Sequence, residues 1–219
     1  MARLNVNPTR MELKRLKARV NTARRGHKLL KDKRDELMKQ FLDIVRVNQE
    51  LRLRVEAALT RAQKGFTVAA AVMSPEQLEQ ALLYPKQSMS LSVDYKNIMS
   101  VDVPKYTYQM KNEDPSDIYP YGYATTSGEL DDAVSALSRV TEDLLRLAET
   151  EKSAQLLAQE IEKTRRRVNA LEYVMIPQLD ETIRYIVMKL DENERGNVTR
   201  LMKVKDMMIQ EKFEENQAG

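Results

Sequence analysis

The residue types that usually carry catalysis or bind metals are scarce in this sequence. Its 219 residues include one histidine, His27, and no cysteine. One histidine cannot build a catalytic triad or a three-ligand zinc site, and without cysteine there are no thiolate ligands, thiol nucleophiles or disulfides. The sequence also lacks a Gly-rich loop, a P-loop and an HExxH motif. We therefore expect no catalytic residue, no bound metal and no cofactor, and we expect His27 to be a polar residue in a helix seam.

The composition favours long helices. The chain is 42% hydrophobic and 32% charged but only 5% aromatic, with six Gly and seven Pro, a balance seldom found in compact α/β enzymes. Its longest apolar run, Val68–Met73, is far shorter than the roughly 20 residues of a membrane span. No apolar segment typical of a secretory signal follows the N-terminus. We expect a cytoplasmic protein without direct membrane insertion.

Helix-breaking residues divide the chain into three segments. Gly26 is the only Gly or Pro between Thr9 and Lys64, and Pro177 is the only one between Glu129 and Arg195, whereas five of the seven prolines lie between Gly65 and Gly128. The pattern predicts a mainly α fold, a long antiparallel two-helix left-handed coiled coil with a small insert at its closed end. The expected parts are an N-terminal helix within 1–65, an insert over 66–127, a C-terminal helix over 128–212 and a flexible tail over 213–219.

Apolar residues recur at alternating steps of three and four along both helices. Of the fifteen positions reached from Leu13 to Ala62, twelve are apolar, and a sustained repeat of 3.5 residues indicates a supercoiled pair. The repeat takes two successive four-residue steps across Met175 to Ile183, where Pro177 predicts a bend or local unwinding. The expected seam residues are Leu16, Val20, His27, Leu30, Leu37, Phe41, Ile44, Asn48, Leu51, Leu144, Ile161, Val168, Leu171 and Met175.

The insert has the signals of a short helix and a hairpin. Ser74 and Gln77 form a capping box with Pro75 between them, which predicts a helix over 75–84. Alternating apolar residues over about 88–108, interrupted at Lys96-Asn97, predict a β-hairpin. If the chain turns at 66 and 128, the numbers of facing helix residues should sum to about 194, which would place Leu13 near Glu181.

The N-terminal segment is basic. Residues 1–35 hold twelve Lys and Arg and three acidic residues, a net charge of +9. A basic helix that continues into heptads is the outline of a bZIP DNA-binding protein. However, Leu13, Leu16 and Val20 carry the apolar seam through the basic stretch, and a DNA-binding basic region needs no seam. Contact with acidic protein surfaces is the favoured use of this charge, and a DNA-binding coiled coil or a generic helical scaffold stays as an alternative.

Three blocks of the sequence resemble a known family. The first runs from Asn7 to Leu37, the second is the hairpin segment Tyr95–Val101, and the third comprises segments between Thr164 and Arg195. Together they resemble the D subunit of the V-type and A-type rotary ATPases, with a prokaryotic member favoured. The resemblance covers essentially the whole chain.

The resemblance implies a role and a set of partners. The D subunit of those complexes is the non-catalytic axle of the central stalk, peripheral to the membrane, and transmits torque between the ATPase head and the ion-translocating membrane ring. The implied partners are the catalytic A and non-catalytic B subunits of the head, the small F subunit of the stalk and the membrane-ring adaptor (the C/d subunit), with no nucleic acid.

The same resemblance assigns contacts along the chain. Two segments should face the head, Arg10–Glu36 and Arg165–Arg195. The expected head contacts are Arg10, Lys14, Arg24, Arg25, Lys28, Arg165, Arg166, Arg167, Arg184 and Arg195. The expected contacts of the insert to the stalk partners are Met89, Leu91, Tyr95, Ile98, Val101 and Val103.

Overall fold

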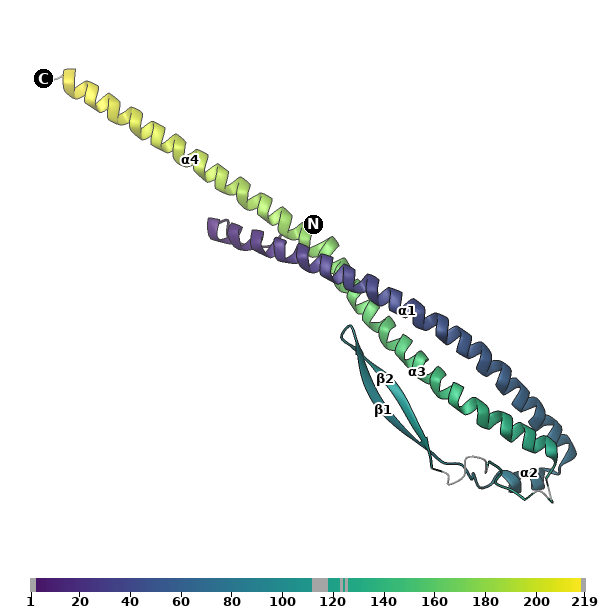
Figure 1. The fold of residues 1–219 in the computed structure, drawn as a ribbon. Helices are drawn as coiled ribbons and strands as arrows, with labels where there is room; N and C mark the ends of the chain where they lie inside the picture. The colour runs from purple at the N-terminus through teal and green to yellow at the C-terminus, as the bar shows by residue number, and fades with distance from the viewer. Residues whose placement is uncertain (1–2, 112–117, 123, 125, 218–219) are drawn as a thin grey trace. The chain divides into compact units, whose positions relative to one another are not determined.

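The computed structural model describes residues 3–111, 118–122, 124 and 126–217, with side chains described up to Ile209. Figure 1 shows the elements in chain order. They are α1 (Arg10–Val72), α2 (Pro75–Leu82), β1 (Met89–Ile98), β2 (Val101–Met110), α3 (Gly128–Ala170), a π turn η1 (Leu171–Met175) and α4 (Ile176–Gln217). The predicted fold class, long helices with a short helix and a hairpin inserted between them, is confirmed.

The chain forms two compact units. The first combines residues 1–32 with 163–219, and the second is the continuous segment 33–162. In each unit, α1 lies antiparallel to a segment from the second half of the chain, because rising numbers on α1 pair with falling numbers on the other helix. In the first unit Arg10 pairs with Glu194 and Arg24 with Asp180. In the second unit Lys33 pairs with Glu160 and Arg54 with Asp143.

The register of the first unit differs from the expected one. The numbers of the residues paired there sum to 199 for His27–Glu172 and to 204 for both Arg10–Glu194 and Arg24–Asp180, so α1 faces positions about five to ten residues later than expected. α1 also does not end at 65 but continues to Val72. Gly65, where the turn was expected, instead lies within α1 and close to Ala133 of α3, since a Cβ added at Gly65 would lie 3.3 Å from the Cβ of Ala133.

A π turn interrupts the C-terminal helix. In η1 (Leu171–Met175) the N–H of Ile176 donates to the carbonyl of Leu171, five residues earlier. The expected local unwinding is therefore present, in the turn directly before Pro177. A π turn holds about one residue more than an α turn, and the two successive four-residue steps in the repeat require one residue more than heptad spacing. The π turn accommodates that residue and keeps Leu179 and Ile186 buried.

The extra residue in η1 predicts opposite effects for two single-residue deletions. Deleting Val174, an exposed residue within η1, should allow a regular α-helix and leave the free energy of unfolding within about 1 kcal/mol of its original value, since the seam stays in phase. Deleting Val187, an exposed residue of α4, should rotate the helix beyond it by about 100° and destabilise the protein. Urea unfolding followed by helical circular dichroism would measure both. Equal destabilisation by the two deletions would contradict the assignment of the extra residue to η1.

The second unit has two clusters of buried residues. One joins Leu37 of α1, Leu157 and Ile161 of α3, and Val101 and Val103 of β2. The other joins Ala69 and Met73 to Ala81 of α2 and Leu130 of α3. The predicted capping box is present at the start of α2. The N–H of Gln77 donates to Ser74 Oγ at 3.3 Å, and the N–H of Ser74 donates to Gln77 Oε1 at 3.4 Å.

The hairpin turn lies later than predicted. β1 pairs with β2 from Met89↔Met110 to Ile98↔Val101, so the two-residue turn is Met99-Ser100 and not Lys96-Asn97. Both turn residues have positive φ, 51° and 71°. Asn97 holds the turn, because its Oδ1 accepts the N–H of Ser100 at 3.1 Å and its Nδ2 donates to Asp102 Oδ1 at 2.7 Å. Glycine is the usual residue for such a turn, and its absence here hid the turn.

The left-handed backbone of Ser100 leads to a prediction for this turn. Glycine adopts positive φ without the steric cost of about 1–2 kcal/mol that other residues incur. Ser100 is exposed, so replacing it removes no buried contact. Ser100→Gly should slow hydrogen exchange of the hairpin amides by about threefold or more. Exchange measured by NMR would test this, with Ser92→Gly, within β1, expected to speed exchange instead.

Candidate functional site

Among the residues that the structure describes, the His, Asp and Glu side chains form no group of three or more that could hold a metal. Within the segments that the structure describes, no helix combines the length and apolar character of a membrane span. The features that can bind a partner are exposed surfaces of the helices and of the hairpin.

The ten basic residues expected to contact the head gather in one unit. All ten are exposed, and all belong to the unit formed by residues 1–32 and 163–219. Two of them have ion-pair partners on the facing helix: Arg24 Nη2 lies 3.0 Å from Asp180 Oδ2, and Arg10 Nη2 lies 3.9 Å from Glu194 Oε2. Exposed ion pairs of this kind contribute about 0–1 kcal/mol each, so these guanidinium groups can exchange partners.

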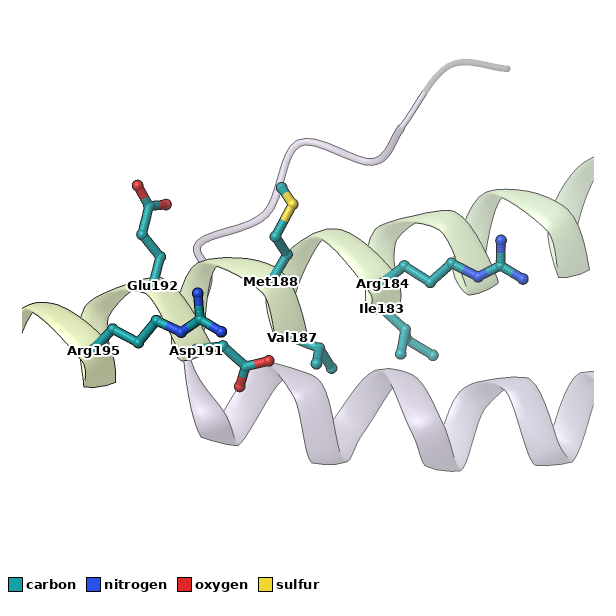
Figure 2. A pocket seen from close by; sticks show the side chains of 7 residues that line it. All are labelled: Ile183, Arg184, Val187, Met188, Asp191, Glu192 and Arg195. Carbon is teal, nitrogen blue, oxygen red and sulfur yellow. The ribbon is translucent and has the colours of Figure 1, made fainter.

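A hollow on α4 borders this basic surface. It has a volume of about 720 Å³ and is lined by residues that are all on α4, as Figure 2 shows: Ile183, Arg184, Val187, Met188, Asp191, Glu192 and Arg195. At its rim Lys189 Nζ lies 2.6 Å from Glu192 Oε2. Hydrogen bonding and charge attraction in this pair raise the pKa of Lys189 and lower the pKa of Glu192. Charged residues of both signs thus lie beside the apolar residues of the hollow, and two of them, Arg184 and Arg195, belong to the head-facing set.

Most of the expected seam residues lie at least partly buried. Leu16, Val20, Leu37, Ile161 and Val168 are buried. The half-buried members are His27, Leu30, Phe41, Ile44, Asn48, Leu51, Leu144 and Leu171.

Met175 is the exception, with 40% of its surface exposed. It lies in the π turn, which turns its side chain out of the seam. Its assignment to the seam was therefore wrong. The two successive four-residue steps of the repeat could have indicated this, because they span one residue more than a heptad and one position must therefore leave the seam.

The polar seam residue His27 faces the π turn that follows α3. Its Nε2 lies 3.3 Å from Glu172 Oε2, within the first unit. Three buried polar residues were not expected from the sequence, Ser153, Thr164 and Thr182. The hydroxyls of Ser153 and Thr182 donate to the carbonyl four residues earlier, each at 2.6 Å. Because this bond satisfies the hydroxyl locally, Ser and Thr can substitute for apolar residues in a seam.

Helices cover part of β2, whereas β1 is mostly exposed. Val101 and Val103 of β2 are buried against α1 and α3, with Ile98 half-buried at the same cluster. Val101 and Val103 were expected to contact stalk partners, and that assignment was wrong, because their own helices cover them. Met89, Leu91 and Tyr95 of β1 are exposed and stay candidates for a partner contact.

Polar contacts also join β2 to α3. The backbone N–H of Tyr106 donates to Glu149 Oε2 at 3.1 Å. Burial and the neighbouring Glu142 carboxylate raise the pKa of the Tyr108 phenol. The outer edge of β2 is therefore engaged by its own chain, and β1 forms the free edge of the two-stranded sheet.

A second apolar hollow lies in the unit that contains the insert. It has a volume of about 520 Å³ and lies between α1, α2 and α3. Exposed large apolar side chains surround it, among them Phe66, Leu82 and Leu137. The sequence pattern did not reveal this surface, because its residues continue the helical repeat and resemble seam positions.

These features define a class of protein: long paired helices with an inserted β-hairpin, which expose charged and apolar surfaces that can bind a partner. Comparison with known proteins identifies the family. The family of the ATP synthase D subunit matches residues 12–206. The chain is 68% identical to the D subunit of the V-type ATP synthase of Acetivibrio thermocellus over 211 residues, covering 96% of this chain and 95% of the relative.

Two further relatives bear the same name. The identity is 66% over 215 residues to the protein of Clostridioides difficile, covering 98% of this chain and 96% of the relative. It is 62% over 212 residues to the protein of Clostridium novyi, covering 96% and 98%. The chain belongs to the family of V-type ATP synthase D subunits, which are non-catalytic, and the resemblance seen in the sequence is confirmed.

Proposed function

We propose that this chain is the rotor of the central stalk in a V-type ATP synthase, and that it transmits torque between the catalytic head and the membrane ring. Family membership carries this proposal. Two helices that bury a common seam resist bending and twisting better than a single helix, and each fully buried seam residue stabilises the pair by about 1.5–3 kcal/mol.

The head-facing part is the unit formed by residues 1–32 and 163–219. The ten exposed basic residues support this assignment, because all of them lie in this unit. An axle must turn inside its bearing without one deeply preferred orientation. Long, solvated Lys and Arg side chains suit this need, since each contact to an acidic loop is weak and exchangeable.

The unit formed by residues 33–162 carries the contacts to the stalk partners. The exposed β1 residues Met89, Leu91 and Tyr95 would face the small F subunit. The apolar hollow around Phe66 and Leu137 would receive the membrane-ring adaptor. In this arrangement the protein is peripheral to the membrane and cytoplasmic.

Reconstitution tests the proposal. The purified chain should assemble with the A and B subunits of the head and with the F subunit, and a bead attached to the hairpin unit should rotate when ATP is added. Because the chain contains no Cys, a single engineered Cys places the bead at a defined position. Assembly without rotation, or ATP turnover that does not depend on this chain, would refute the rotor. Salt-sensitive binding to duplex DNA in place of assembly would favour the DNA-binding alternative.

A further inference from the structure

The segment that precedes α1 is attached to α4 by two polar contacts. The N–H of Leu4 donates to Thr182 Oγ1 at 3.2 Å, across 178 positions of the sequence. The Arg3 guanidinium lies 3.6 Å from the centre of the Tyr185 ring. Cations at such distances are attracted to the face of an aromatic ring. Residues 3–9 are thus not helical and run beside α4. Figure 2 shows this segment in pale purple, passing from the first turn of α1 over α4.

Apolar contacts accompany the polar ones. Leu4 and Val6 pack against the buried cluster of the first unit, which consists of Leu16, Val20, Leu179 and Ile186. The segment therefore covers the seam at the end where α1 begins. An extended segment with alternate apolar residues can cover a helix pair in this way because Leu4 and Val6 point to the same side.

Thr182 is the anchor of this contact. Its side chain is fully buried, and its hydroxyl group both donates to the Gln178 carbonyl at 2.6 Å and accepts from Leu4. A buried hydroxyl lacking partners is costly, so both bonds favour the observed position of the segment.

The ion pairs Arg10–Glu194 and Arg24–Asp180 also join α1 to α4 in this unit, and they are exposed. Arg10 Nη2 lies 3.9 Å from Glu194 Oε2, and the two side chains are 83% and 67% exposed. The Arg24–Asp180 pair is also open to solvent. Solvent and salt screen such pairs, and the terminal turns of a helix fray unless other contacts hold them.

We propose that residues 3–9 are a strap that holds the first turns of α1 on α4, with Thr182 as its positioning residue. The strap acts within the free chain and needs no partner subunit. Its failure would therefore be independent of whether the chain is a rotor.

Hydrogen exchange of the isolated full chain, measured by NMR, tests the strap. Thr182→Val keeps the volume of the side chain and removes the acceptor of the Leu4 N–H. Exchange of the Leu4 amide and of the amides from Leu13 to Val20 should become about fivefold to tenfold faster. Thr164→Val is the matched control, because Thr164 is also buried in this unit but is not part of the cluster that the strap covers. It should leave these amides unchanged.

A second variant acts from the strap itself. Leu4→Ala removes apolar contact without altering either helix, and should accelerate exchange of the same α1 amides while those of α4 beyond Val198 stay unchanged. Salt at about 0.5 M should change this result little, since the strap does not depend on ion pairs between side chains. Unchanged α1 exchange in Leu4→Ala, or equal acceleration in Thr164→Val and Thr182→Val, would overturn the proposal.

Discussion

Replacing Leu37 with Ala should lower the free energy of unfolding of the unit formed by residues 33–162 by about 2–5 kcal/mol. Leu37 is fully buried and joins α1 to Leu157 and Ile161 of α3. The substitution removes three carbon atoms and leaves a cavity, because the surrounding helices and β2 relax only in part.

Leu29→Ala is the matched control on the same helix. Its side chain is 69% exposed, so the loss should stay below about 0.5 kcal/mol. Urea unfolding followed by circular dichroism measures both variants, and hydrogen exchange of β2 should accelerate only in Leu37→Ala, since Val101 and Val103 pack against the same cluster. Similar losses for the two leucines would mean that Leu37 does not connect the hairpin with the helix pair.

Replacing Arg165, Arg166 and Arg167 together with Ala should weaken binding of the chain to the head by about tenfold to 100-fold. All three side chains are exposed and belong to the unit proposed to enter the head. Each exposed charge contact contributes about 0–1 kcal/mol, and 1.4 kcal/mol corresponds to a tenfold change in affinity. Titration of the head with labelled chain would measure the change, and ATP-driven rotation should slow or stop more often.

A charge-matched control separates this contact from a general effect of lost charge. Arg52, Arg54 and Arg61 are also exposed, but lie on α1 in the other unit. Their replacement with Ala should leave head affinity within about twofold, since distant exposed charges are screened. The difference between the two triple variants should shrink as salt rises. Unchanged assembly and rotation in the Arg165–Arg167 variant would reject the basic contact.

The long helices could be predicted because their signals are local and repeated. The apolar repeat that begins at Leu13 indicates which face of α1 is buried without any knowledge of its partner. The capping box at Ser74 likewise fixed the start of α2 from four neighbouring residues. The family resemblance rested on ordered blocks and needed no coordinates.

Other features depended on residues far apart in sequence. Val101 and Val103 have the alternation of a strand, which does not say whether a partner protein or the chain's own helices cover them; contact with Leu37 and Leu157 decided that. The π turn exposes Met175 and keeps Val168, before the turn, and Leu179, after it, buried in the seam.

Long paired helices with a hairpin insert follow from the amino-acid sequence alone, because a heptad repeat and turn residues act over a few neighbouring positions. The covered side of the hairpin and the contact of Leu4 with Thr182 depend on the packing of the folded chain. Burial and hydrogen bonding of these groups are set by atoms up to 178 residues away in the sequence, and those atoms come together only when the whole unit packs.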